Sequence, residues 1–364
     1  MKLLTIFPIF TKRHAQVLST HVEHVLICDK RTPFNGNGTS TKVVPLSVGY
    51  FGINQLLTFF NKEGTAPAYM HGLQTVLQNE LPDRIVVTDF FQLYFWQCVR
   101  FVKRKQGSQL FLYSETKQLP NNGLSRLAML FFLWRLRHNQ KYIQSIFVFT
   151  EQGRLFFKSR FPEMQVVVIP NPIDTDLFYP QEKVALKDDV LHILMVARYV
   201  AYKRHKDVLD AISLVIQQGK KVQVTFVGKA GGDKESIREY ARSLNLEQFV
   251  NFLDPVPECD MGDVYNAHDI LILPSYNEAI GLAVPEAMAC GLPTVTSDTV
   301  GANIYVEKGV TGYIYTTYDV SGLVECIIKL HDRERIVHMG QNARARVQSF
   351  SINNGVELFL RALD

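Results

Sequence analysis

Cysteine is scarce in this sequence, and the cysteines that occur are isolated from one another. None belongs to a C-x-x-C pair and their number is odd, so neither a disulfide framework nor a zinc cluster is predicted. No apolar run reaches the roughly 18 residues that a membrane-spanning helix needs. A basic cluster follows the first short apolar run, the reverse of the order in a signal peptide. We therefore expect a protein of the reducing cytoplasm, with five cysteines: Cys28, Cys98, Cys259, Cys290 and Cys326.

Hydrophobic residues, in contrast, are abundant. They make up 47% of the 364 residues, against 20% charged residues. This composition excludes a disordered chain, and the length favours two domains. Residues 1–180 hold 20 Lys and Arg against 11 Asp and Glu, whereas the remainder holds 19 against 24. The asymmetry indicates two domains with different partners, and an uneven solvated surface is the alternative interpretation.

The second half of the sequence alternates short apolar runs with amphipathic stretches. Runs without clean polar alternation, each followed by a helical pattern, predict a parallel sheet buried on both faces. We expect a doubly wound α/β domain over residues 190–350, with its ligand at the carboxyl ends of the strands. The predicted strands are 191–197, 222–228, 249–253, 269–275, 293–297 and 311–317.

The first half predicts a second α/β sheet, over residues 1–175. The stretch 171–189 has two prolines, several charges and no period, so it reads as a linker between the domains. Helices are expected at 54–60, 67–80, 92–106 and 124–142. The predicted strands are 2–8, 24–28, 42–48, 83–89, 109–115, 145–150 and 165–171.

One stretch, residues 274–302, is the most informative about function. It reads PSYNEAIGLAVPEAMACGLPTVTSDTVGA, with Glu278 just after a predicted strand and Glu286 in the first turns of the next helix. Gly281 lets backbone approach a ligand closely. The positive end of the helix suits a pyrophosphate, and a carboxylate beside it can accept hydrogen bonds from sugar hydroxyls. In the structural alternative, Glu286 is a helix-start residue and Glu278 a solvated loop acid.

This stretch resembles the E-x7-E element of the retaining glycosyltransferases of glycosyltransferase family 4 (group 1). Flanking segments extend the resemblance over roughly residues 165–345: VIPNPIDTDLFYP, VARYVAYKRHKDVLDAI, VYNAHDILILPS and EKGVTGYIY. The resemblance implies the GT-B fold, in which two Rossmann-like doubly wound parallel-sheet domains face each other across a cleft. It also implies that the C-terminal helix, 351–364, packs back on the N-terminal domain.

The resemblance further implies how residues 190–350 bind a nucleotide-sugar donor. Glu286 would bind the ribose hydroxyls, and Glu278 would contact the transferred sugar. Arg198 and Lys203 would hold the pyrophosphate, where fixed cations stabilise the charge of the departing diphosphate. Lys206 is the alternative to Lys203. The sugar and phosphate would also lie near four consecutive loop residues: Ala279, Ile280, Gly281 and Leu282.

No metal or other cofactor is expected. The segment Asp174-Thr175-Asp176 matches the metal-binding D-x-D signature of another glycosyltransferase fold. It lies in the linker-like stretch, however, where the resembled family has a structural Asp. Arg198 and Lys203 already supply positive charge for the leaving group.

The N-terminal half departs from the family pattern, because it lacks the Gly-Gly loop after the first strand. Lys12 or His14 could replace that loop on the acceptor side, and Glu115 stands where the family often has a His. A carboxylate there could orient or deprotonate an acceptor hydroxyl. A surface turn for Lys12 and His14, and a salt bridge for Glu115, are equally compatible with the sequence.

Two segments, 98–107 and 126–141, combine basic and apolar residues. The continuous apolar run 127–134 covers every face of a helix, which favours a core helix. Contact with an anionic membrane face is the second interpretation. Nucleic-acid binding is the least favoured of the three, because no recognised motif accompanies the charge. A basic domain would also attract a phosphorylated or acidic saccharide acceptor.

The resemblance to this family therefore implies a retaining, metal-independent hexosyltransferase. It would move a hexose-type sugar from a UDP or GDP conjugate to a saccharide, lipid-linked or phosphorylated acceptor, in glycan, glycolipid or cell-surface polysaccharide synthesis. The alternatives are a nucleotide-sugar epimerase on the same fold and a non-catalytic protein that binds sugar nucleotides or polyanions. The base, sugar, acceptor, linkage and oligomeric state are not predicted.

Overall fold

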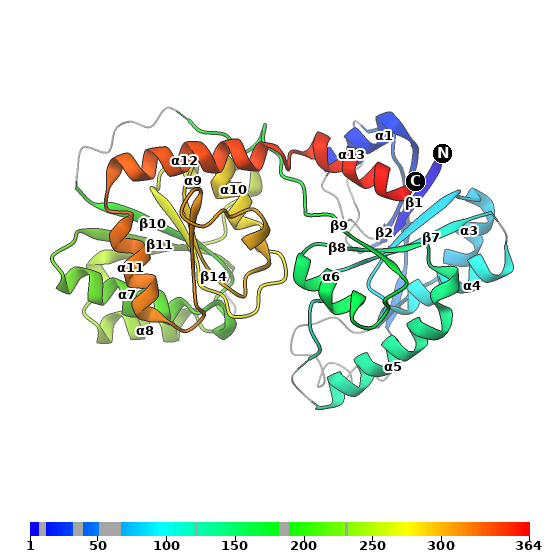
Figure 1. The fold of residues 1–364 in the computed structure, drawn as a ribbon, viewed down its shortest axis with the longest axis horizontal. Helices are drawn as coiled ribbons and strands as arrows, with labels where there is room; N and C mark the ends of the chain where they lie inside the picture. The colour runs from blue at the N-terminus through cyan, green and yellow to red at the C-terminus, as the bar shows by residue number, and fades with distance from the viewer. Residues whose placement is uncertain are drawn as a thin grey trace. The chain divides into compact units, whose positions relative to one another are not determined.

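The computed structural model describes residues 1–6, 12–31, 39–50, 67–105, 107–120, 123–181, 189–229 and 232–364. The chain divides into two compact units (Figure 1). Unit 1 comprises Met1–Pro170 and Ile352–Asp364, and unit 2 comprises Asn171–Ser351. Each unit is built on its own parallel sheet, as the sequence predicts. In the described part of the chain, no helix is both long and apolar enough to cross a membrane.

Unit 2 is a doubly wound domain whose six strands are all parallel, in the order β12-β11-β10-β13-β14-β15. Most residues of β10, β11, β13 and β14 are buried, including the hydroxyl residues of β14, because helices cover both faces of the sheet. Helix α7 neighbours α8 and α11, and α10 neighbours α12 (Figure 1). The strands are β10 (Leu191–Val196), β11 (Val222–Val227), β12 (Val250–Leu253), β13 (Ile270–Leu273), β14 (Thr294–Ser297) and β15 (Gly312–Tyr315).

The helices of unit 2 follow these strands in the alternating pattern that the sequence predicts. They are α7 (His205–Gln217), α8 (Lys234–Ser243), α9 (Met261–Asn266), α10 (Ala283–Ala289), α11 (Val320–Lys329) and α12 (Arg333–Gln348). Short 3-10 turns η2 (Ala201–Lys203), η3 (Glu247–Phe249), η4 (Glu258–Asp260) and η5 (Gly301–Ile304) complete the unit.

The segment 171–181 is part of unit 2, so reading it as linker is wrong for these residues. Ile173 donates its backbone N–H to the carbonyl of Phe350 at 2.9 Å, and the Arg344 guanidinium donates to the carbonyl of Phe178 at 2.9 Å. Backbone hydrogen bonds and buried apolar side chains hold a proline-containing stretch in place without any periodic pattern. Residues 182–188 of the predicted linker lie outside the described residues.

Unit 1 also holds a parallel sheet, with the order β3-β2-β1-β6-β7-β8-β9. A short antiparallel pair, β4 (Val48–Tyr50) and β5 (Ala68–Met70), stands beside it. The strands of the large sheet are β1 (Lys2–Ile6), β2 (Glu23–Asp29), β3 (Lys42–Leu46), β6 (Arg84–Thr88), β7 (Gln109–Ser114), β8 (Ser145–Val148) and β9 (Gln165–Val168).

The described helices of unit 1 include the C-terminal helix, which lies beside α1 (Figure 1). Phe359 of this helix contacts Phe147 edge-to-face at 5.9 Å between ring centroids, and Asp364 pairs with Arg84 at 2.9 Å. The helices are α1 (Lys12–His21), α3 (Leu73–Glu80), α4 (Leu93–Arg104), α5 (Gly123–Asn139), α6 (Glu151–Lys158) and α13 (Ile352–Leu363), with the 3-10 turn η1 (Gln140–Tyr142) after α5.

Two helix predictions in unit 1 need correction, and a third concerns residues that the structure does not describe. Residues 67–80 do not form one helix, because Ala68–Met70 pairs with β4 and Gly72, at φ +80°, turns the chain into α3. The apolar run 127–134 does not form a core helix, because one face of α5 is exposed. The helix predicted at 54–60 lies outside the described residues.

Candidate functional site

The candidate site lies at the switch point of the unit 2 sheet. Strand β10 is flanked by β11 on one side and by β13 on the other, so the chain leaves β10 and β13 in opposite directions. Ligands of doubly wound sheets bind at such a point, beyond the carboxyl ends of the strands. The loop after β10 carries Arg198 and Lys203, and the loop after β13 carries Glu278. Strand order alone thus brings together residues 75 positions apart in sequence.

Lys203 and Glu278 form an ion pair between these two loops. Lys203 ends the 3-10 turn η2, and its side chain is 11% exposed, against 15% for Glu278. Burial and the neighbouring Arg198 guanidinium lower the pKa of Lys203 to about 8. The ammonium is therefore still mainly protonated at pH 7, and the ion pair with Glu278 favours that charged form. The pair joins a cation to a carboxylate in a largely dry environment.

The third charged group, Arg198, lies at the exposed rim of the same site. Its guanidinium donates a hydrogen bond to the Tyr202 hydroxyl at 2.6 Å. The carbonyl of Tyr202 in turn accepts the backbone N–H of Tyr276 at 3.0 Å, which ties the two loops together. A cation that is exposed and oriented by a neighbour is suited to bind an anion from solution. Lys206, the alternative cation, is exposed on α7 with its ammonium over the Tyr240 ring.

The loop from Ala279 to Leu282 is shaped by Gly281, whose φ is +79°. A Cβ at this position would lie 3.0 Å from the Leu273 side chain and 3.1 Å from the Glu278 side chain. Both the left-handed backbone and the lack of space require glycine. Gly281 therefore leaves room for the Glu278 side chain beside this loop. Ala279 and Ile280 are half-buried, and Leu282 is exposed.

A second glycine, Gly301, supports this loop from the segment that follows β14. Its backbone N–H donates to the carbonyl of Glu278 at 2.9 Å. A Cβ at this position would stand 1.8 Å from the carbonyl oxygen of Ala279, which no side chain can occupy. The segment after β14 thus holds the Glu278 backbone in place. Gly301 lies within the stretch 274–302, but the sequence alone does not indicate its role.

Glu286 lies on α10, where its carboxylate accepts a hydrogen bond from the Tyr265 hydroxyl at 2.6 Å. Tyr265 is fully buried on α9. Desolvation raises the pKa of Glu286 to about 7, and the Tyr265 hydrogen bond partly opposes that shift. A carboxylate poised near neutrality and oriented by a buried tyrosine is a good acceptor for hydroxyl groups. Sequence reasoning misses Tyr265, because a Tyr before a strand resembles any core residue.

The predicted acceptor-side residues lie in unit 1. Lys12 begins α1, and its side chain lies outside the described residues. His14 is 4% exposed on the same helix. Glu115 is exposed just after β7, near Asp89, which follows β6. Burial and the charge of Glu115 raise the pKa of Asp89 to about 7. Sequence reasoning misses Asp89, although an Asp that ends the apolar strand DRIVVTD is a usable signal.

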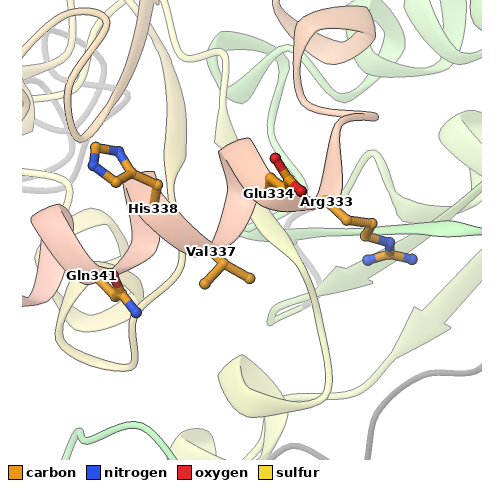
Figure 2. A pocket seen from close by; sticks show the side chains of 5 residues that line it. All are labelled: Arg333, Glu334, Val337, His338 and Gln341. Atoms are coloured by element: carbon orange, nitrogen blue, oxygen red, sulfur yellow. The ribbon is translucent and has the colours of Figure 1, made fainter.

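Two other features bear on the predicted site. Asp174 accepts the backbone N–H of Leu177 at 3.1 Å, which gives this carboxylate a local structural role in unit 2. Among the described residues, no group of three or more His, Cys, Asp or Glu could hold a metal ion. Figure 2 shows an open hollow on unit 2, and none of the residues that line it is a candidate site residue: Arg333, Glu334, Val337, His338 and Gln341.

Comparison with known proteins shows which proteins this half of the chain is similar to. Residues 180–346, just under half of the chain, match the family model described as glycosyl transferases group 1. These residues hold all of the donor-side candidates: Arg198, Lys203, Glu278, Ala279, Ile280, Gly281, Leu282 and Glu286. Residues 180–346 therefore resemble the group 1 glycosyltransferases.

Curated relatives match slightly more than half of the chain. A D-inositol 3-phosphate glycosyltransferase of Corynebacterium aurimucosum is 30% identical over 205 residues, which is 52% of this chain and 48% of the relative. The protein of the same name from Gordonia bronchialis is 26% identical over 226 residues, 58% of this chain and 49% of the relative. The chain thus matches about half the length of these curated relatives.

Solved structures match over the full length. Sucrose-phosphate synthase of Thermosynechococcus elongatus superposes with a TM-score of 0.79 at 18% identity, covering 100% of this chain and 98% of that one. Anabaena HepE in complex with UDP superposes with a TM-score of 0.78 at 18% identity, covering 100% and 99%. With two Rossmann-like parallel sheets, the chain has the GT-B fold that the sequence predicts.

Proposed function

We propose that this protein is a retaining glycosyltransferase that moves a hexose-type sugar from a nucleotide-diphosphate sugar to an acceptor hydroxyl, without a metal. The observation that carries the proposal is the convergence of Arg198, Lys203 and Glu278 at the switch point of the unit 2 sheet. The match of residues 180–346 to the family model of group 1 glycosyl transferases supports it. In this proposal unit 2 binds the donor and unit 1 the acceptor.

Arg198 and Lys203 are assigned to the diphosphate of the donor. As the bond between the anomeric carbon and the phosphate oxygen breaks, negative charge grows on the leaving diphosphate. Two fixed cations stabilise that charge, and the low exposure of Lys203 strengthens its contribution. Because these cations suffice for the leaving group, the mechanism we propose uses no metal.

The two glutamates are assigned different parts of the donor. Glu286, with a pKa near neutrality and a tyrosine that orients it, accepts hydrogen bonds from the ribose hydroxyls. Glu278 and the loop that Gly281 shapes contact the transferred sugar. When the donor binds, the Lys203 ammonium lies between the Glu278 carboxylate and the new negative charge of the diphosphate. It can therefore interact with both.

For the donor, we propose a uridine diphosphate sugar. For the acceptor, we propose a polyol or a saccharide. HepE structures described as complexes with UDP and with UDP-glucose share this fold, which supports UDP. The name of the curated relatives supports a polyol acceptor. A role in glycolipid or surface-polysaccharide synthesis at the cytoplasmic side of a membrane is part of the same proposal.

The test is a donor assay in EDTA. Wild-type protein is incubated with UDP-glucose, and separately with GDP and ADP conjugates, with and without an acceptor polyol such as D-inositol 3-phosphate, which the name of the curated relatives suggests. Released nucleotide and the anomeric configuration of the product are followed by NMR. We expect one donor to be consumed, with retained configuration in any product.

Each contrary outcome points to a specific alternative. An epimer formed from donor alone would show an epimerase. Binding of a nucleotide without consumption of any donor would show a non-catalytic binding protein. Activity that requires a divalent ion would contradict the metal-free mechanism.

A further inference from the structure

Helix α5 has an apolar surface on two opposite sides. One side packs into the core of unit 1 through Leu133 and Leu136, which are 6% and 0% exposed. The other side is exposed to solvent, although its residues are large and hydrophobic. We call this the outer face of α5, and it consists of Leu124 (55% exposed), Leu127 (63%), Leu130 (42%), Phe131 (52%) and Trp134 (57%).

The outer face is one continuous stripe along the helix. Leu124, Leu127, Phe131 and Trp134 are spaced by three, four and three residues, which places them on the same side of the helix. The rings of Phe131 and Trp134 stack at 6.0 Å between centroids, so the stripe is also locally ordered. Figure 1 shows α5 at the periphery of unit 1. A monomeric soluble protein seldom exposes a contiguous apolar stripe of this kind without a partner.

The surroundings of the outer face are strongly basic. Residues 90–150 contain nine Lys and Arg and a single acid, Glu115. Lys103 at the end of α4 and Lys141 in η1 both lie over the Tyr142 ring, at 4.9 and 5.1 Å, so their charges meet at the end of α5. Six of these cations are exposed: Arg100, Lys103, Arg104, Arg126, Arg137 and Lys141.

We propose that the outer face of α5 docks on an anionic lipid bilayer, with the helix lying in the plane of the interface. An interfacial helix buries aromatic and aliphatic side chains below the headgroups while its basic residues pair with anionic lipid. Trp134 and Phe131 would enter the headgroup boundary, and Arg126 and Arg137 would contact phosphate groups. This docking is independent of the donor site in unit 2.

Charge favours a lipid surface over the other partners that could cover an apolar stripe. A second copy of the chain, related by two-fold symmetry, would bring basic residues against basic residues. A nucleic acid would satisfy the cations but leave the leucine side chains in contact with water. Of these three partners, an anionic bilayer is the one that satisfies both the apolar stripe and its basic border.

The experiment uses the full chain and its only two tryptophans. Trp96 is buried at 6% exposure, so a change in emission on adding vesicles reports Trp134. Vesicles of phosphatidylglycerol and phosphatidylcholine in equal amounts are titrated into the protein without donor, and cosedimentation is measured in parallel. We expect a blue shift of emission, which Trp134→Phe reduces, and binding that weakens as salt is raised.

Variants separate this surface from general stickiness. The double variant Leu127→Ser/Phe131→Ser is expected to lower the partition coefficient by about tenfold or more. Leu155→Ser, at a residue that is 58% exposed on α6 of the same unit, is the matched control and should bind as wild type. Arg126→Gln/Arg137→Gln should weaken binding to the anionic vesicles.

Three results would overturn the proposal. The first is a failure of wild-type protein to bind the anionic vesicles. The second is binding to pure phosphatidylcholine vesicles that is as strong as binding to the anionic vesicles. The third is a dimer that wild-type protein forms without lipid and that the Leu127→Ser/Phe131→Ser change dissociates. Because no donor is present, failure here leaves the proposed glycosyltransferase activity untouched.

Discussion

Replacing Lys203 by Met tests the structural role of the Lys203–Glu278 ion pair separately from the catalytic role that we propose for it. Both side chains are largely buried, at 11% and 15% exposure, so the substitution leaves the Glu278 carboxylate without its counter-charge in a poorly solvated place. Breaking a buried pair by removing one partner costs about 3 kcal/mol of unfolding free energy. In a domain of this size, that corresponds to a fall in Tm of roughly 6 to 12 °C.

The double variant Lys203→Met/Glu278→Gln removes both charges. Because no uncompensated charge is left, its unfolding free energy should return to within about 1 kcal/mol of wild type. Its donor turnover should stay lower by about 10²-fold or more, because the diphosphate has lost one of its cations. Thermal unfolding and nucleotide release are measured on the same preparations. A double variant as unstable as the single one would refute the energetic reasoning, and one with near-wild-type turnover would refute the catalytic assignment.

Three further variants test other parts of the site. Arg198→Ala should change the unfolding free energy by less than about 0.5 kcal/mol, because the side chain is exposed. It should nevertheless lower the rate of nucleotide release by about 10²-fold or more. A wild-type rate would show that Arg198 does not belong to the leaving-group site. Tyr265→Phe removes the hydrogen bond that lowers the pKa of Glu286, so that pKa should rise. Nucleotide affinity should increase with pH as Glu286 ionises, and the midpoint of this increase, near pH 7 in wild type, should move to higher pH in the variant. An unchanged midpoint, measured by titration calorimetry across the neutral range, would contradict this. Gly301→Ala puts a Cβ 1.8 Å from the Ala279 carbonyl oxygen and should lower both Tm and activity, whereas Gly123→Ala, with no atom within 4 Å, should lower neither.

Much of the fold follows from the sequence because its strands are buried on both faces. Continuous apolar runs, each followed by a helical pattern, mark the strands of both sheets without reference to tertiary contacts. The order of the strands does not follow in this way, because pairing of β10 with β13 depends on contacts between segments about 80 residues apart. The position of the switch point therefore needs the structure, although its residues are already marked by the motif at 274–302 and by the segment that holds Arg198 and Lys203.

The errors share a physical cause, which is that local pattern does not reveal neighbours. Residues 68–70 form a strand because β4 and the side chains of Gln92 and Gln97 offer partners for their backbone groups. The run 127–134 is apolar on every side, yet the core of unit 1 covers only one side of α5. Likewise, the ion pair of Lys203 and Glu278 and the Tyr265–Glu286 hydrogen bond join residues that sequence spacing does not connect.

The most direct test of the central claim is titration calorimetry of UDP, GDP, ADP and their sugar conjugates into the protein in EDTA. The account predicts that one nucleotide binds wild-type protein and the control Glu334→Gln, an acid on the remote α12, with equal affinity. The same nucleotide should bind Glu286→Gln and Arg198→Ala at least about tenfold more weakly, because each loses a contact to a charged group. No binding of any nucleotide to folded wild-type protein, or equal binding to all four proteins, would contradict a nucleotide-sugar site at the carboxyl edge of the unit 2 sheet.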